Sequence, residues 1–96
     1  MRRRNTEPLK DVLKRYVRAI GGEQKIKEIR LKKSWESLMG KNISEQTEYV
    51  FIKKGVFYVK LRSSVVKHEL MLMRSQITER LNNEAGETLI NDVAFI

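Results

Sequence analysis

The 96-residue sequence contains no cysteine and only one histidine. Without cysteine there can be neither a disulfide framework nor a thiolate zinc site. A Cys–His nucleophilic pair and a histidine-rich metal cluster are excluded as well, and no phosphate-cradling glycine loop is present. The single histidine, His68, lies between Lys67 and Glu69 and is interpreted as a surface residue. The sequence therefore predicts a protein that is not an enzyme and that holds no cofactor or metal.

Long hydrophobic runs are missing too. The longest runs, such as those at 49–52 and 56–59, cover only four residues, whereas a membrane-spanning helix needs about 20. No hydrophobic signal core follows the basic N-terminus. We therefore expect no membrane partner and a cytoplasmic location. With 41% hydrophobic residues and a single proline, the chain is expected to fold as one domain over residues 1–96.

Positive charge is in excess and is unevenly distributed. Twenty Lys and Arg residues against twelve Asp and Glu residues give a net charge of +8. Residues 1–33 hold twelve basic and four acidic residues, whereas residues 34–96 hold eight of each. We therefore divide the domain into a basic, helical N-terminal part (1–33) and a charge-balanced core (34–96).

Segregated cations indicate a polyanion partner, although Lys and Arg can also do no more than solvate helix faces. The basic part is expected to contact DNA phosphates without reading bases. The residues predicted to make these contacts are Arg2, Arg3, Arg4, Lys10, Lys14, Arg15, Arg18, Lys32 and Lys33.

Apolar periodicity predicts a helix over 9–20, capped by Thr6 or Glu7 with Pro8 in its first turn and ended by Gly21-Gly22. A second helix is expected over 23–39, its first turns packed on the first helix and its last turns on a sheet. β-branched and aromatic residues predict strands at 43–52 and 56–61, joined by a loop that ends at Gly55. A third helix is expected to begin at Ser63-Ser64 and to be ended by Asn82, Asn83 and Gly86, and a last strand is expected at 89–96.

This order, α-α-β-β-α-β, predicts an α+β domain in which the helices lie on one face of a small three-stranded mixed sheet. The strand–helix–strand crossover should make the third strand parallel to the second. Alternation within the hairpin predicts a core face formed by Val50, Ile52, Phe57, Val59 and Leu61.

Alternation places Tyr49, Phe51 and Tyr58 on the opposite face of the hairpin, beside Lys60 and Arg62. Exposed aromatic rings among cations are typical of surfaces that bind single-stranded nucleic acid, because bases stack on rings while cations meet phosphates. Three interpretations remain open. The face binds nucleic acid, it is covered by a partner or by a second copy of the chain, or the two faces are reversed.

Read as a string, the core resembles the DciA family of bacterial replicative helicase loaders or operators. The resemblance spans residues 31–95. It rests on the order and spacing of Trp35, Leu38-Met39-Gly40, Thr47, Gly55, Phe57, Val59, Ser63-Ser64, Glu69-Leu70, Leu81-Asn82 and Ile90-x-x-Val93-x-Phe95. It implies a KH-like core, DNA binding and association with the hexameric helicase DnaB, without nucleotide hydrolysis.

Structural roles are expected for the motif residues themselves: Trp35 as a core anchor, Gly40 and Gly55 in backbone turns, Ser64 at a helix start, and Glu69 and Leu70 in local pairing and packing.

Two features depart from the family pattern. Val66 stands where many members have an aromatic residue, which should alter packing under the third helix. Many members also continue into a basic extension after the last strand, whereas this chain stops at Ile96. We therefore expect a short form, in which helicase contact comes from the folded domain or from the basic N-terminal helices.

The resulting hypothesis is a non-enzymatic accessory protein of DnaB that binds single-stranded or forked DNA and assists helicase loading or operation in replication initiation. Two alternatives stay open: a KH-like RNA-binding module, which the lack of a Gly-x-x-Gly loop disfavours, and a homodimeric protein-interaction domain.

Overall fold

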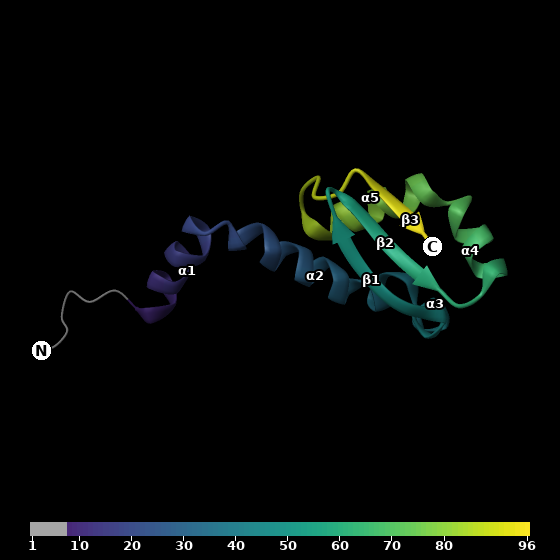
Figure 1. Cartoon of the computed structure of the whole chain (residues 1–96), viewed down its shortest axis with the longest axis horizontal. Helices are drawn as coiled ribbons and strands as arrows, with labels where there is room; N and C mark the ends of the chain where they lie inside the picture. Colours follow the sequence, from purple (N-terminus) through teal and green to yellow (C-terminus); the bar gives the residue numbers. More distant parts are fainter. Residues whose placement is uncertain (1–7) are drawn as a thin grey trace, which may run out of the picture.

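The computed structural model describes residues 8–96, which form a helical arm and a mixed α/β core (Figure 1). Arg2, Arg3 and Arg4, with the expected capping residues Thr6 and Glu7, lie outside the described residues. The elements follow in the order α1 (Leu9–Ala19), α2 (Gly22–Met39), α3 (Lys41–Gln46), β1 (Thr47–Lys53), β2 (Val56–Leu61), α4 (Ser64–Met71), α5 (Arg74–Ala85) and β3 (Asp92–Phe95).

The sheet has the strand order β1-β2-β3. Strand β1 pairs antiparallel with β2 through a two-residue loop. The loop residues Lys54 and Gly55 have φ angles of +50° and +78°, the left-handed conformation that a tight hairpin turn requires at both positions. Strand β3 pairs with β2 in parallel, as predicted, because the chain crosses from one strand to the other through α4 and α5.

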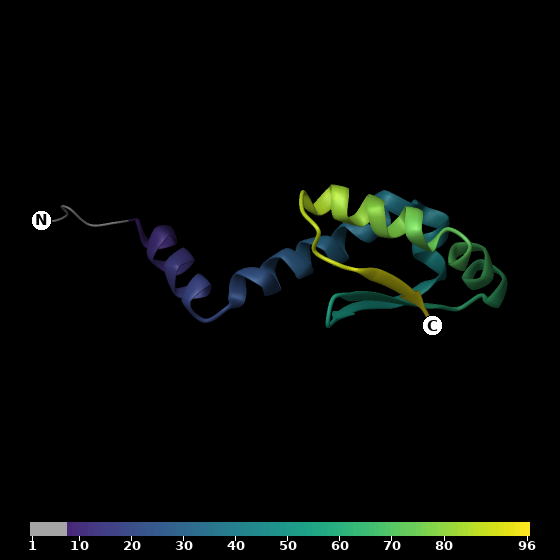
Figure 2. The ribbon, with the colours of Figure 1, turned by 90° about the horizontal axis from the view of Figure 1, so that it is seen from above.

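The core helices cover one face of the sheet (Figure 2). Strand β2 buries Phe57, Val59 and Leu61 on that face, while Val50 and Ile52 of β1 are half-buried against them. The remaining buried residues come from four other elements and the loop before β3: Leu31 and Trp35 of α2, Leu70 of α4, Ile77 and Leu81 of α5, Leu89 and Ile90 of the loop, and Val93 and Phe95 of β3. The predicted α+β architecture and the predicted hairpin faces are confirmed.

Helix α1 and the first half of α2 project from this core (Figure 1). The chain bends at Gly21, which has a φ of +76°, and continues toward the core as α2 (Figure 1). The Val17 side chain packs next to Gly22, the first residue of α2. Even so, α1 has no buried residue. The expected packing of α2 on α1 is therefore limited to the region of their junction. We call residues 8–33 the basic arm; it carries nine basic and three acidic residues.

The first correction concerns the segment after Gly40. A strand was expected from Ile43, but residues 41–46 form the short helix α3 and β1 begins at Thr47. The segment Lys41–Gln46 offers one β-branched residue among helix-compatible Lys, Glu and Gln. Helical geometry turns Ile43 onto the core, and this burial outweighs its β-preference.

The second correction concerns the predicted third helix, which is two helices, α4 and α5. The chain leaves helical geometry at Met73, where φ is −108° and ψ is 17°. Helix α4 packs on β2 and β3, whereas α5 packs mainly on α2 and β3. The two sets of contacts require two axis directions (Figure 2). Leu72 and Met73 at the break are exposed.

The last strand is shorter than predicted, because β3 begins at Asp92 rather than at Leu89. Leu89 and Ile90 lie in the preceding loop and are nevertheless buried. Asn91 N–H donates a hydrogen bond to the carbonyl of Gly55 at 2.6 Å, which fixes this loop to the hairpin. A Cβ at Gly55 would lie 2.7 Å from the side-chain amide nitrogen of Asn91, which would have to move. The φ of +78° at this position favours glycine in addition.

Candidate nucleic-acid interface

The outer face of the sheet is the side away from the core helices (Figure 2). Strand pairing places Phe51 of β1 opposite Tyr58 of β2, with Tyr49 two pairs further along, on the same face, opposite Lys60. The rings of Phe51 and Tyr58 stack with centroids 4.7 Å apart and planes 10° apart. Tyr49 stacks on Phe51 with centroids 6.1 Å apart. The three predicted aromatic residues thus form one continuous group, which we call the aromatic face.

Solvent reaches the aromatic face unevenly. Tyr49 is 51% exposed, whereas Phe51 and Tyr58 are half-buried because each ring covers part of the other. Strand β3 continues the outer face beside Tyr58 with the small residue Ala94. A flat aromatic surface bordered by a small side chain gives a nucleobase room to stack.

The two cations predicted to accompany the aromatic face have different surroundings. Lys60 lies directly across from Tyr49 on the outer face. Arg62 instead directs its guanidinium to backbone carbonyls, donating to Glu45 at 2.5 Å and to Thr47 at 3.4 Å. Arg62 therefore holds the end of α3 against the hairpin, and Lys60 is the better placed of the two for a phosphate.

The basic arm carries the remaining predicted phosphate contacts within the described residues. All are exposed except Lys32, which is half-buried. On α1, Lys10, Lys14 and Arg18 recur every four residues and so form one stripe, while Arg15 lies between two of them in sequence. The structure thus brings Lys10, Lys14 and Arg18 together, and it places Lys32 and Lys33 on α2, near the base of the arm.

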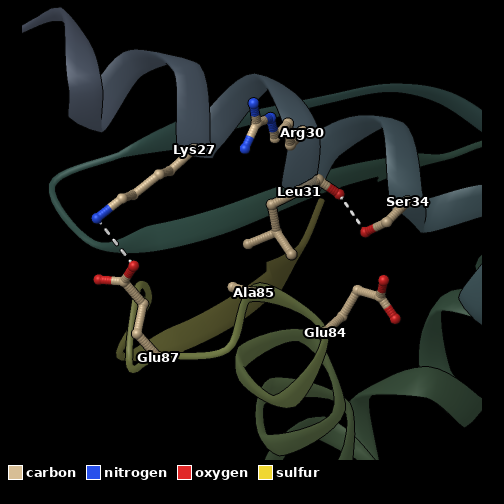
Figure 3. Close-up of a pocket in the computed structure, with 7 residues that line it drawn as sticks. All are labelled: Lys27, Arg30, Leu31, Ser34, Glu84, Ala85 and Glu87. Carbon is tan, nitrogen blue, oxygen red and sulfur yellow. Dashed lines mark hydrogen bonds and ion pairs between the residues drawn. The ribbon is translucent and has the colours of Figure 1, made fainter. Parts of the chain in front are cut away.

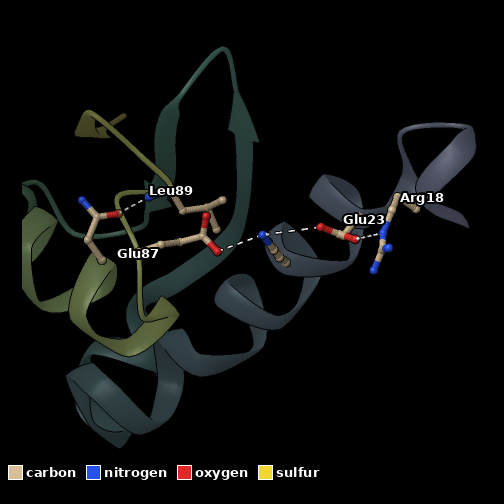
Figure 4. Close-up of polar contacts among 6 residues, drawn as sticks. Arg18, Glu23, Glu87 and Leu89 are labelled. Carbon is tan, nitrogen blue, oxygen red and sulfur yellow. Dashed lines mark hydrogen bonds and ion pairs between the residues drawn. The ribbon is translucent and has the colours of Figure 1, made fainter. Parts of the chain in front are cut away.

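A chain of ion pairs runs from the arm to the core (Figure 4). Arg18 Nε lies 3.1 Å from a Glu23 carboxylate oxygen, and Lys27 Nζ lies 3.9 Å from the other. Lys27 Nζ also lies 2.9 Å from Glu87, which follows α5. The hydrogen bond and charge of Glu87 raise the pKa of Lys27 above its ordinary value. Exposed pairs of this kind add little stability, and of these pairs only the one between Lys27 and Glu87 joins the arm to the core.

A pocket of about 300 Å³ lies beside Lys27, between α2 and the end of α5 (Figure 3). Lys27 and Arg30 line one side of the pocket, and Glu84 and Glu87 line the other. The opposite charges balance one another, so this pocket lacks the cationic excess that a phosphate site requires.

The motif residues have structural surroundings. The Trp35 indole is 3% exposed and lies 5.6 Å from the Phe57 ring, centroid to centroid. Gly40 and Gly55 have φ angles of +90° and +78°. Ser64 is the first residue of α4, although Ser63 is the residue whose hydroxyl caps it, accepting a hydrogen bond from the Val66 N–H at 3.2 Å.

The remaining motif residues are on α4. Leu70 is buried in the core, whereas Glu69 is exposed and makes no ion pair with any residue of 8–96. His68 is exposed as well.

Sequence reasoning missed the role of Asn82, which was interpreted only as a residue that ends a helix. Its Oδ1 accepts a hydrogen bond from the Leu89 N–H at 2.8 Å (Figure 4) and one from the Ile90 N–H at 3.0 Å. Its Nδ2 donates to the Ile90 carbonyl at 2.9 Å. The side chain therefore fixes the loop that leads into β3. The resemblance had included Asn82, but no local pattern distinguishes it from Asn83.

Residues 8–96 contain no group of three or more His, Asp or Glu side chains that could hold a metal ion. None of the helices in this range combines the length and the apolar character needed to cross a bilayer.

Comparison with known proteins identifies the family. The protein-family model described as "Dna[CI] antecedent, DciA" matches residues 8–95. No curated protein and no solved structure matches the chain, so the KH-like resemblance stays a prediction. DciA proteins are accessory proteins of the loader type, associated with the replicative helicase DnaB. Because the match covers nearly the whole sequence and includes the basic arm, the chain belongs to the DciA family.

Proposed function

We propose that this chain is a non-enzymatic, DNA-binding accessory protein that assists the loading or operation of a DnaB-type helicase in the initiation of replication. It acts in the cytoplasm, on single-stranded or forked DNA. The observation that carries the proposal is the segregation of charge. A projecting arm holds nine basic against three acidic residues, while residues 34–96 are balanced at eight of each.

The arm supplies phosphate contacts. Lys10, Lys14 and Arg18 repeat once per helical turn of α1, so they present charge to a nucleic-acid backbone along one line. Such contacts depend on the phosphates alone and carry no base preference. This suits an accessory that follows a helicase over every sequence.

The aromatic face supplies base contacts. The nearly parallel rings of Phe51 and Tyr58 offer the flat surface on which an unpaired base can stack, and Lys60 lies on the same face. Bases inside a duplex are already stacked, so this contact favours single strands. The combination of arm and aromatic face therefore supports a preference for single-stranded or forked DNA.

Two measurements test the proposal. Fluorescence anisotropy compares the affinity of the chain for oligothymidylate, for the same sequence as a duplex and for oligouridylate RNA. Pull-down with purified DnaB, after nuclease treatment, measures helicase contact without bridging DNA. We expect tighter binding to the single DNA strand than to the duplex or the RNA, and retention of DnaB. Selective RNA binding would favour an RNA-binding module, and a self-dimer that binds neither nucleic acid nor DnaB would favour a protein-interaction domain.

A further inference from the structure

DNA binding by cations leaves one surface of the arm without a role, namely the apolar stripe of α1. Leu9, Leu13, Tyr16 and Ile20 recur at helical spacing, and each is between 51% and 72% exposed. Single exposed apolar residues are ordinary, but a continuous stripe indicates an interaction surface. Within residues 8–96, nothing covers this stripe.

The stripe leads into a cleft on the inner side of the angle between α1 and α2. The cleft measures about 520 Å³, and its apolar residues are Leu13 and Val17 of α1 and Ile26 of α2. Its other lining residues are five cations and one acid, namely Lys10, Lys14, Arg18, Lys27, Arg30 and Glu23. An apolar floor is thus bordered by positive charge on both helices.

Not all of these cations are neutralised. Arg18 and Lys27 pair with Glu23, and Lys27 also pairs with Glu87. Lys10, Lys14 and Arg30 make no ion pair with another residue of 8–96. The cleft therefore keeps an uncompensated positive charge on both sides of its apolar floor.

We propose that this cleft binds an acidic amphipathic helix of a partner protein. The apolar face of that helix packs on Leu13, Val17 and Ile26, in the helix-in-groove mode. Lys10 and Lys14 are one helical turn apart, so carboxylates spaced three or four residues apart on the incoming helix can meet both. Arg30 receives acidic residues on the opposite edge.

Charge and shape favour this occupant over two others. A second copy of the chain would bring its own arm, with nine basic and three acidic residues, against the same cations, and like charges across an interface oppose association. A bilayer surface is nearly flat, whereas the apolar residues of the cleft lie between two helices. The apolar contacts can be tested separately from DNA binding, because Leu13, Val17 and Ile26 are not among the proposed phosphate contacts, whereas Lys10 and Lys14 are shared with them.

The test uses the whole chain and a synthetic helix with leucine on one face and glutamate on both flanks. Its binding is measured by isothermal titration calorimetry against the double variant Leu13→Gln/Ile26→Gln. The matched control is Val65→Gln/Leu72→Gln, which changes two exposed apolar residues outside the arm. We expect the cleft variant to lose at least about tenfold in affinity and the control to lose almost none.

Charge is tested with the same helix carrying lysine in place of glutamate, which should bind at least about tenfold more weakly. Equal affinity of both helices, or equal affinity of the cleft and control variants, would overturn the proposal. The proposal would also be overturned if the chain bound anionic phospholipid vesicles more tightly than the acidic helix. Self-association of the chain that disappears in the cleft variant would overturn it as well. Oligothymidylate affinity should be unchanged in Leu13→Gln/Ile26→Gln. If the native chain does not bind oligothymidylate, the proposed function is wrong, but the proposal for the cleft is unaffected.

Discussion

The indole nitrogen of Trp35 donates a hydrogen bond to the hydroxyl oxygen of Thr47 at 3.0 Å, and this hydroxyl in turn donates to the Ile43 carbonyl at 2.8 Å. The pair links the buried half of α2 to the first residue of β1. It therefore sets the direction in which α2, and with it the basic arm, leaves the sheet.

Thr47→Val should destabilise the fold by about 1 to 3 kcal/mol, because valine keeps the shape but leaves the Trp35 N–H without its partner. Urea unfolding followed by circular dichroism measures the change in free energy. Thr78→Val is the matched control, since the Thr78 hydroxyl bonds only to the Arg74 carbonyl within its own helix, α5. If both variants lose equal stability, the Trp35–Thr47 bond does not have the role assigned to it.

Asn82→Ala should cost about 2 to 3 kcal/mol, because three hydrogen bonds to the backbone of Leu89 and Ile90 are lost together. Asn83→Ala removes the same side chain from the next, exposed position of α5. Thermal unfolding of the two variants provides the comparison. A similar decrease in melting temperature for both would show that the Asn82 bonds do not hold the loop before β3.

Glu87→Gln should lower the pKa of Lys27, because Glu87 supplies both the hydrogen bond and the largest charge that raise it. Because the pKa of Lys27 is higher in the folded chain than its ordinary value of 10.5, the protonated side chain stabilises the fold, and this contribution is fully present at pH values below 10.5. This contribution is lost as the pH rises through the raised value.

Titration of the Lys27 side chain by NMR measures the shift. Glu84→Gln is the control, because Glu84 lines the same pocket (Figure 3) but makes no ion pair with any residue of 8–96. An unchanged Lys27 pKa in Glu87→Gln would contradict the ion pair between Lys27 and Glu87 that joins the arm to the core.

Phe51→Leu and Tyr58→Leu should each weaken oligothymidylate binding by about 1 to 3 kcal/mol, the usual value of one stacked base. Phe51→Tyr retains a ring and should retain most of the affinity. Anisotropy measures the affinity, and analytical ultracentrifugation of the same variants measures the oligomeric state. Unchanged DNA affinity combined with loss of a dimer would reassign the aromatic face to self-association.

The elements that sequence predicted best are those where local preference and burial agree. Alternation in the hairpin indicated both faces of the sheet. Gly21 and Gly40 marked the ends of helices and Gly55 marked the hairpin turn, because positive φ favours glycine. The parallel pairing of β3 followed from the chirality of the crossover connection.

The misses lie where tertiary contacts decide. The break at Met73 arises because α4 and α5 pack on different elements. The sequence between Leu70 and Ile77 contains no glycine or proline that would predict a helix end there. The engagement of Arg62 with backbone carbonyls and the cleft around Ile26 join different segments of the chain. The hydrogen bonds of Asn82 span only seven or eight residues, but they depend on how the loop after α5 folds back. Charge segregation could be counted along the chain, but the placement of that charge on a projecting arm required the structure.

The salt dependence of single-stranded DNA binding tests the central claim most directly, since each phosphate contact releases a counterion. For the native chain, the logarithm of affinity for oligothymidylate should fall steeply with the logarithm of salt between about 50 and 200 mM. In Lys10→Gln/Lys14→Gln the slope should become shallower by roughly 0.7 for each phosphate that the variant no longer neutralises. The charge-matched control Lys41→Gln/Lys67→Gln, in the balanced core, should keep the native slope. A flat native dependence, or equal slopes in the arm and core variants, would contradict phosphate binding by the arm.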